Sequence, residues 1–330
     1  MKKKIFGLIL VAMGLSSCED FLTRDPMDKL TDSESLWENG ENFRLMNYAF
    51  YDVYFEGYDI SWNRADWFAE TEVADWNDDN AQKAPTFFTK VAPESSGLWD
   101  FTYIRRHNQL IDRASNSNMD EATKNHWIGV SRFLRAMEYA ELVRNFGDVP
   151  WFDKVIENTD YENLYKPRDS RATVMDNVLA DLQFACENIL KADGTKGLTI
   201  NKAVALAFTS RLMLFEGTWQ KYRAKNNDLA KKYLQAAKDA ADKLMAMGEY
   251  SIHKDWKELT SSISLAGNPE VILYREYEMG VKTHSLMSFQ NTEAEGSSPS
   301  RSLVDSYLSA NGLPIYQTEN TMFKGDKWFF

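Results

Sequence analysis

Apolar residues recur at helical spacing along most of the chain, and this periodicity predicts a mostly α-helical protein. The clearest pattern starts at Val130 and runs to Val143, and the helix-stop sequence Gly147–Pro150 follows it. The same spacing predicts five more helices, at Ser33–Tyr54, Trp99–Ala114, Thr173–Lys191, Asn201–Trp219 and Asp228–Met247.

The last two predicted helices are expected to form an antiparallel hairpin, because only a short polar segment connects them. The first of the pair is rich in small residues, which let a neighbouring helix approach closely; these are Ala203, Ala205, Ala207 and Ser210. Such pairs resemble tetratricopeptide repeats, although the chain shows no strict period of 34 residues.

Two parts of the chain lack helical periodicity. Residues 57–97 form a long excursion, and structureless segments of that length are usually functional or disordered. Towards the end, Val271–Tyr274 has the composition of a short strand, and Thr292–Ser300 is polar. No linker separates two domains, so one helical domain is expected over residues 33–330.

Composition narrows the functional classes. The 330 residues include 38 basic and 49 acidic side chains, a net charge of −11 that argues against a binder of nucleic-acid phosphates. Apolar residues make up 44% of the chain, which is typical of a globular protein. The unusual feature is the aromatic content of 13%, since it exceeds what a core of this size needs.

The first 17 residues have the form of a signal peptide. Three lysines precede an apolar run, Ile5–Leu15, that is too short to span a membrane as a helix. The run ends in Leu15-Ser16-Ser17-Cys18, which resembles the lipobox of bacterial lipoproteins, where the cysteine is acylated. We therefore predict a lipid anchor on Cys18 and a tether over residues 18–32; the alternative is an ordinary secretory signal.

Several segments in the same order along the chain resemble the SusD/RagB family of outer-membrane nutrient-binding lipoproteins. The most specific motif is Arg132-Phe133-Leu134-Arg135-Ala136, which leads to Phe146-Gly147-Asp148-Val149-Pro150. The other matching segments are Cys18–Leu22, Leu98–Ile104, Asn108–Ile111, Lys166–Arg168, Asn201–Ala203, Gly217–Trp219, Asn268–Ile272, Leu303–Tyr307 and Asn311–Ile315.

This resemblance implies a SusD-like fold with tetratricopeptide-like helix pairs and long irregular loops. It also implies a surface-exposed, lipid-anchored protein of the outer membrane that binds oligosaccharide. The expected partner is a SusC-type TonB-dependent transporter, with no cofactor and no nucleic acid. Members of this family are usually longer, so we expect this chain to lack a C-terminal part.

The predicted excursion has the composition of a glycan site. Sugars present weakly polar ring faces and many hydroxyls, so their sites combine exposed aromatic planes with carboxylates and amides. No Lys or Arg lies between Arg64 and Lys83. The candidate ligand-binding residues are Tyr58, Trp62, Trp67, Trp76, Asn77 and Asp78, with Trp328 and Tyr316 as further candidates near the end.

Other interpretations of this segment stay open. The tryptophans could instead pin a long loop to the core while the acids remain solvated. Residues 75–80 also alternate acids and amides, but Asn80 stands where an EF-hand requires glycine and Thr86 where it requires glutamate. An irregular calcium site is not excluded by this pattern.

No catalytic motif is present, and a non-enzymatic protein is expected. The four histidines are far apart, and the chain has neither a nucleophile elbow nor a P-loop. Arg132, Arg135 and Arg144 are expected to pair with acids on neighbouring helices, and Cys186 to be a packed core thiol. Two alternatives remain, a surface glycoside hydrolase using two acids of the 66–79 segment and a helical-repeat scaffold of the cell envelope.

Overall fold

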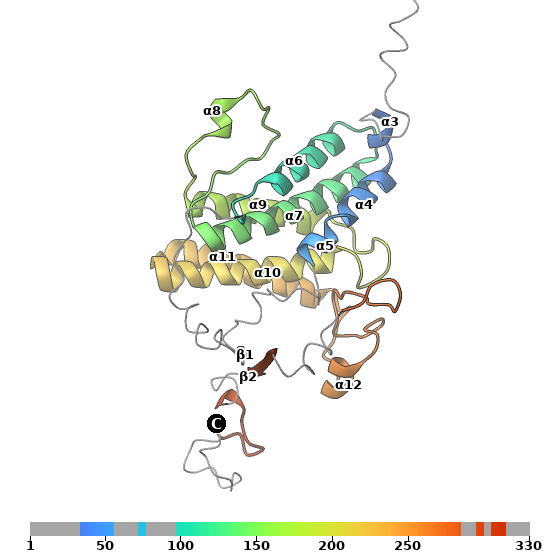
Figure 1. Ribbon diagram of the computed structural model, residues 1–330, viewed down its shortest axis with the longest axis vertical. Helices are drawn as coiled ribbons and strands as arrows, with labels where there is room; N and C mark the ends of the chain where they lie inside the picture. The colour runs from blue at the N-terminus through green and yellow to red at the C-terminus, as the bar shows by residue number, and fades with distance from the viewer. Residues whose placement is uncertain (1–33, 56–71, 77–96, 285–294, 300–304, 315–330) are drawn as a thin grey trace, which may run out of the picture. The chain divides into compact units, whose positions relative to one another are not determined.

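A computed structural model describes residues 34–55, 72–76, 97–284, 295–299 and 305–314 (Figure 1). These residues divide between two compact units. The first contains the described residues up to Tyr54 together with Asp100–Leu273, and the second contains Phe55–Trp99 and Tyr274 onwards where described. Each unit combines stretches that are distant in the sequence, which is why no single linker marks the division.

The described part of the first unit is helical, as predicted. Its helices are α3 (Glu34–Trp37), α4 (Gly40–Tyr48), α5 (Tyr51–Tyr54), α6 (Thr102–Ser115), α7 (Glu121–Phe146), α8 (Tyr161–Leu164), α9 (Arg171–Asn188), α10 (Lys202–Trp219), α11 (Asn227–Ala246) and α12 (Trp256–Ser261). A π-helical turn, η3 (Gln220–Ala224), extends α10. The described part of the second unit contains strands β1 (Glu72–Trp76) and β2 (Glu295–Pro299).

Local side chains determine where the long helices begin. The side chains of Asp120, Ser170 and Asn201 accept hydrogen bonds from backbone N–H groups in the first turns of α7, α9 and α10. These bonds satisfy donors that have no partner within the helix. At the other end, α7 stops at Gly147, whose φ of 74° lies in the left-handed region.

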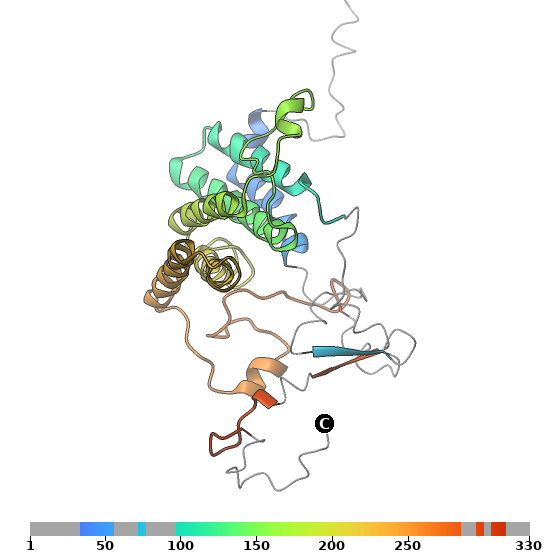
Figure 2. The same ribbon diagram turned by 90° about the vertical axis from the view of Figure 1, so that its left-hand side faces the viewer.

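The long helices pack in chain order, α6 on α7, α7 on α9, α9 on α10 and α10 on α11, as Figures 1 and 2 show. The closest approach between α10 and α11 depends on Gly217, because a Cβ there would lie 2.7 Å from Leu234 Cγ. Ala203 and Ala205 are fully buried. The predicted alanine-rich helical hairpin is thus confirmed.

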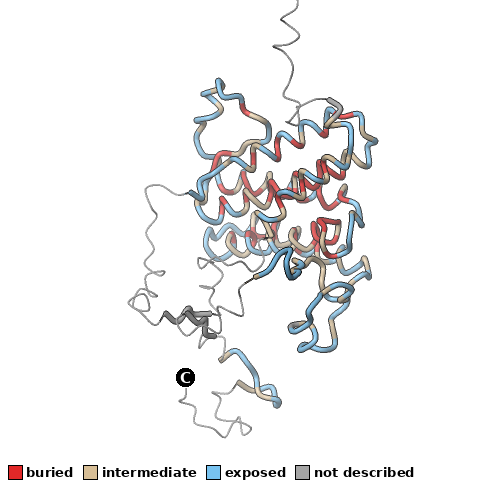
Figure 3. Tube along the Cα trace, turned by 45° about the vertical axis from the view of Figure 1, so that its right-hand side comes forward, coloured by how far each residue is buried: buried red, intermediate tan, exposed pale blue. Residues whose placement is uncertain are grey.

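The core lies between these helices, where the buried positions concentrate (Figure 3). From α7, Phe133, Leu134 and Tyr139 have no exposed surface. Cys186 is buried as predicted, and its Sγ lies 3.3 Å from Thr209 Oγ1. Burial raises the pKa of this thiol, which makes it an unreactive core residue.

A buried ion pair joins α7 to α9. Arg135 donates from Nε and Nη2 to the two carboxylate oxygens of Asp181, each at 2.8 Å, and both residues are 2% exposed. Arg132 Nε lies 3.2 Å from Asp181 Oδ1. The third nitrogen of Arg135 donates to Asn108 Oδ1 on α6 at 2.6 Å and to Asp153 O at 3.2 Å. One guanidinium therefore links three helices and the segment after α7.

A second buried ion pair joins α9 to α10. Arg171 donates to both carboxylate oxygens of Glu216, at 2.6 to 3.1 Å, and Gln220 Nε2 donates to the same carboxylate at 2.8 Å. The guanidinium also lies 3.8 Å from the centre of the Trp219 ring. The carboxylate is fully buried, but its charge is compensated on several sides.

Three expectations need correction. The single helix predicted over Ser33–Tyr54 is broken into α3, α4 and α5, because Asn39 is extended and caps a new helix. Val271–Tyr274 forms no strand, since the Val271 N–H bonds within a turn to Asn268 O. Arg144 pairs with Glu141 on its own helix and not with a neighbouring one.

A buried histidine lies where α5 meets α6. His107 Nε2 is 2.9 Å from Tyr54 Oη, and the Phe50 ring centre lies 4.6 Å from the imidazole. Burial, with a smaller contribution from the positive charges of Arg135 and Arg106, lowers the pKa of His107 to about 3. The imidazole is therefore neutral in the folded protein at ordinary pH.

We predict that Arg135→Met lowers the free energy of unfolding by about 3 kcal/mol, because it leaves the buried Asp181 carboxylate with Arg132 alone. Arg144→Met is the matched control, since that side chain is 57% exposed and should contribute less than about 1 kcal/mol. Urea unfolding of the whole chain measures both values. Equal losses for the two variants would contradict a central role for the Arg135 pair.

We also predict that stability falls with pH below about 6.5, the ordinary pKa of histidine. Below this pH, His107 is protonated in the unfolded chain, whereas in the folded protein it stays neutral down to about pH 3. Acid therefore favours unfolding. At pH 5 this difference amounts to about 2 kcal/mol. Urea midpoints between pH 4.5 and 7.5 should decline less steeply for His107→Gln than for the wild type, and parallel profiles would refute the assignment.

Candidate functional site

The segment that carries the predicted aromatic site is paired with a distant stretch of chain. Strand β1 is antiparallel to β2, with Glu72 opposite Pro299 and Trp76 opposite Glu295. The sequence suggested only a polar stretch at 292–300, because Glu-Gly-Ser-Ser-Pro has low strand propensity. The ladder fixes the backbone on which Trp76 lies.

The side chains of the predicted ligand site are not described. Tyr58, Trp62, Trp67, Asn77, Asp78, Tyr316 and Trp328 lie outside the described residues, and Trp76 is described by its backbone alone. Cys18 and the predicted signal peptide also lie outside them. The aromatic glycan platform and the lipid anchor therefore stay predictions.

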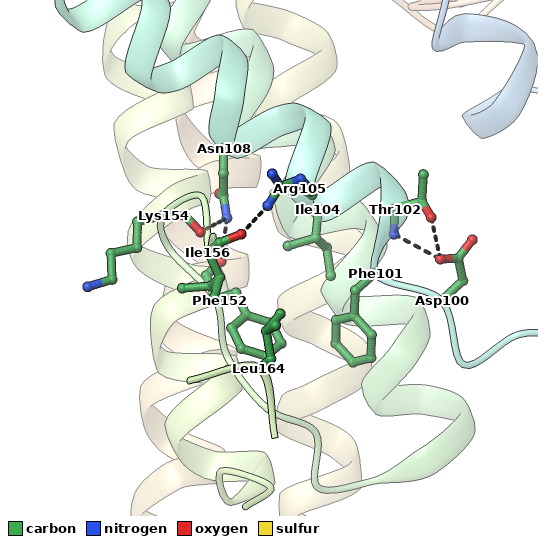
Figure 4. A pocket seen from close by; sticks show the side chains of 10 residues that line it. All are labelled: Asp100, Phe101, Thr102, Ile104, Arg105, Asn108, Phe152, Lys154, Ile156 and Leu164. Carbon is green, nitrogen blue, oxygen red and sulfur yellow. Dashed lines mark hydrogen bonds between the residues drawn. The ribbon is translucent and has the colours of Figure 1, made fainter. Parts of the chain in front are cut away.

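The helical unit contains a cavity of about 280 Å³ between the start of α6 and the segment after α7 (Figure 4). Its walls are largely apolar, with charged side chains at the edges. The lining residues are Asp100, Phe101, Thr102, Ile104, Arg105, Asn108, Phe152, Lys154, Ile156 and Leu164.

Hydrogen bonds hold the polar walls of this cavity in place (Figure 4). Asp100 Oδ1 accepts bonds from Thr102 N at 2.9 Å and Thr102 Oγ1 at 2.6 Å. These bonds lower the pKa of Asp100, so its carboxylate is ionised at neutral pH. Arg105 Nη1 donates to Ile156 O, and Asn108 Nδ2 donates to the carbonyls of Phe152 and Lys154, each at 3.0 Å.

The cavity lies at the base of a long loop, residues 147–170, which we call the α8 loop (Figure 1). Lys166 closes the loop by donating to Trp151 O at 2.6 Å and to Asp169 Oδ2 at 2.9 Å. Asp169 Oδ2 also accepts from Trp151 N at 2.8 Å. Burial raises the pKa of Asp169, but these hydrogen bonds lower it by more, so the carboxylate is ionised. The ion pair of Lys166 and Asp169, through its bonds to Trp151, thus joins the two ends of the loop.

The outer part of the α8 loop exposes two aromatic rings. Tyr161 is 66% exposed and Tyr165 is 80% exposed. Their ring centres are 6.5 Å apart and their planes differ by 10°. Leu164, between them in the sequence, lines the cavity. The two exposed rings therefore flank, in sequence, a residue that lines the cavity.

The chemistry of the cavity suits ligand binding. Apolar walls lie beside one anionic side chain, Asp100, and two cationic ones, Arg105 and Lys154. The described residues contain no group of three or more His, Cys, Asp or Glu side chains that could hold a metal ion. The polar atoms of Asn108 are engaged by Arg135 and by the loop carbonyls.

Sequence reasoning missed this surface. The motifs Leu98–Ile104 and Lys166–Arg168 were recognised only as parts of a family pattern, and the tyrosines were not singled out. A usable signal was present, because two tyrosines four residues apart lie among the acidic and amide residues of 157–163 and just after them. The cavity itself depends on contacts between α6 and the loop, which no local pattern reveals.

No family model matches the chain, but it is similar in sequence and in fold to SusD-like proteins. It is 27% identical over 291 residues to SusD-like protein P38 of Formosa agariphila, an alignment that covers 82% of the chain and 52% of that protein. The chain therefore spans about half the length of this curated relative.

Solved structures agree in fold. The structure of a SusD-like carbohydrate-binding protein from Bacteroides fragilis matches with a TM-score of 0.64 and 19% identity, over 85% of this chain and 55% of that chain. A laminarin-binding SusD-like protein matches with a TM-score of 0.56 and 20% identity, over 72% of this chain and 51% of that chain. These matches confirm the predicted SusD-like helical fold.

Proposed function

We propose that this chain, which is SusD-like in both sequence and fold, is a cell-surface glycan-binding protein that delivers oligosaccharide to a SusC-type TonB-dependent transporter. The binding surface in this proposal is the aromatic segment around β1, with Tyr58, Trp62, Trp67 and Trp76 as ring platforms. Asn77 and Asp78 supply hydrogen bonds to sugar hydroxyls, and Trp328 contributes from the end of the chain.

One observation carries the proposal. Three of the ten tryptophans, Trp62, Trp67 and Trp76, lie within one acidic segment of the sequence, the last two in a stretch without Lys or Arg. Residues 72–76 of the same segment pair with β2. A loop that only covered the core would need neither the acids nor exact backbone pairing at Trp76. Aromatic faces beside carboxylates and amides are the composition that binds sugar rings.

The comparisons support the ligand class. A relative of the same fold binds laminarin, and another is a carbohydrate-binding protein. Both are binding proteins and not hydrolases by description, which favours capture over turnover. A surface glycoside hydrolase would need two carboxylates about 5–10 Å apart around the bond that is cleaved.

Anchoring belongs to the same proposal. Within the described residues, no helix combines the length and the apolar character required to cross a membrane. The lipobox at Leu15–Cys18 supplies a different attachment. Each methylene of an acyl chain on Cys18 that is buried in lipid contributes about 0.8 kcal/mol of binding free energy. The protein then faces the outside of the outer membrane, where polymeric nutrients arrive.

We predict that the double variant Trp67→Ala/Trp76→Ala weakens binding to neutral polysaccharides about tenfold or more, since it removes two stacking faces. Affinity gel electrophoresis with laminarin, xyloglucan and pullulan measures the loss. Trp256→Ala is the matched control, because that ring is 76% exposed on α12 and should not matter.

Two outcomes would contradict the proposal. Unchanged retardation of the double variant on every polysaccharide that retards the wild type would exclude the two tryptophans from the site. Release of shorter sugars from the same polysaccharides would replace capture with hydrolysis.

We predict that Cys18→Ser abolishes lipid attachment and moves the protein out of the membrane fraction. The reason is that only the thiol of Cys18 can carry the acyl chain in a lipobox. Metabolic labelling with a palmitate analogue, followed by membrane fractionation, measures both effects. Cys186→Ser is the control, because that buried thiol should not be acylated, and equal labelling of wild type and Cys18→Ser would rule out the anchor.

A further inference from the structure

We propose that the α8 loop, with the cavity at its base, is a second carbohydrate-binding surface for neutral glycans, separate in sequence from the aromatic segment around β1. This inference rests on the proposed function for its ligand class. It assigns that ligand to residues of the helical unit, which no family motif marks as a binding site.

The first argument is the state of the two tyrosine rings. Large aromatic side chains are usually at least partly buried, yet Tyr161 and Tyr165 are 66% and 80% exposed. Their planes are nearly parallel, with 10° between them and ring centres 6.5 Å apart. Each ring offers a flat apolar face with a hydroxyl group at its edge, which suits a sugar ring.

The second argument is that the backbone carrying the two rings is ordered before any ligand binds. Asp160 caps α8 by accepting bonds from Asn163 N at 3.2 Å and Asn163 Nδ2 at 2.7 Å. The base of the loop is closed by Lys166 and Asp169, and by a β-bridge between Val149 and Asp169. Because the fold has already ordered this backbone, a ligand pays little entropy to bind against it.

The third argument is the cavity that the α8 loop lines. Leu164 borders it, and Phe101 and Phe152 meet edge to face in its wall, with ring centres 5.6 Å apart. The ionised carboxylate of Asp100 and the cationic groups of Arg105 and Lys154 also line it (Figure 4). An acceptor and a donor beside apolar walls match a ligand with many hydroxyls.

Charge decides among the possible ligands. The tip of the loop carries Glu157, Asp160 and Glu162, and no Lys or Arg lies between Lys154 and Lys166. This acidic tip would repel anionic lipids, nucleic acids and acidic polysaccharides, whereas the cavity carries Asp100 together with Arg105 and Lys154. Protein interfaces are depleted of charge at their centres, whereas this tip alternates aromatic and acidic side chains. The same combination marks the segment around β1, so a neutral glycan fits both.

The test compares three variants of the whole chain by affinity gel electrophoresis in laminarin, xyloglucan and pullulan, with alginate as the anionic probe. Tyr161→Ala/Tyr165→Ala should weaken binding to at least one neutral polysaccharide about threefold to tenfold. Tyr161→Phe/Tyr165→Phe keeps the ring faces and should stay within about twofold of the wild type. Tyr222→Ala, which removes a 66% exposed tyrosine elsewhere in the helical unit, should have no effect.

A second comparison separates the two surfaces. Added to Trp67→Ala/Trp76→Ala, the tyrosine-to-alanine pair should cause a further loss of similar factor, because independent sites contribute additively. Thermal unfolding should be unchanged in the tyrosine variants, since both side chains are exposed.

The failures are distinguishable. If the wild type is retarded and the tyrosine-to-alanine pair is retarded equally on every neutral polysaccharide, the second surface is refuted and the proposed function stands. A partner-protein role for the loop would produce that same result. If the wild type is retarded by no glycan, the proposed function fails and this inference fails with it. Retardation by alginate alone would overturn the choice of a neutral ligand.

Discussion

The helical unit depends on the buried guanidinium of Arg135. Its donors reach Asp181 on α9, Asn108 on α6 and the carbonyl of Asp153 at the start of the α8 loop, so one side chain sets the spacing of three helices and a loop. Burying this charge is favourable only because its partners on all three sides are present. Asn108, oriented by Arg135, then donates to the carbonyls of Phe152 and Lys154 and shapes the wall of the cavity. The geometry of the cavity therefore depends on the buried Arg135–Asp181 ion pair, and neither residue lines the cavity.

Another set of buried polar side chains has the same structural role. Arg171, Glu216 and Gln220 form a second buried network, with Trp219 stacked on the guanidinium, where α9 meets α10. The motif Arg132–Ala136 supplies Arg135, the segment Gly217–Trp219 supplies the stacked Trp219, and Phe146–Pro150 contains the helix stop at Gly147. They build the scaffold, and binding is left to the segments that the scaffold displays. In both proposed surfaces aromatic residues lie among acidic ones, in the stretches 65–82 and 155–165, which contain no Lys or Arg; this composition suits neutral sugars rather than phosphate or lipid headgroups.

Much of the fold could be predicted because its determinants are local. The capping side chains of Asp120, Ser170 and Asn201 and the glycine at 147 act within a few residues, so the ends of α7, α9 and α10 follow from sequence. The expectations that failed depended on distant partners or on competing local bonds. Asn39 caps a new helix within the stretch predicted as one helix, and Arg144 pairs with Glu141 one turn away on its own helix. Strand β2 has no strand-forming composition and exists by pairing with β1.

By itself, the sequence determined the mostly helical class, the acidic charge, the lipobox at Cys18 and the aromatic, acidic composition of its candidate glycan segment. All of these are properties of residues that are close together in the sequence, so they can be inferred without the tertiary structure. The tertiary structure alone decided that Arg135 and not Arg144 is the buried cation, that Trp76 lies opposite Glu295, and that Tyr161 and Tyr165 stand exposed beside a cavity. Each of these features depends on contacts between residues that are distant in the sequence. Such contacts, and the burial they cause, form only when the chain folds.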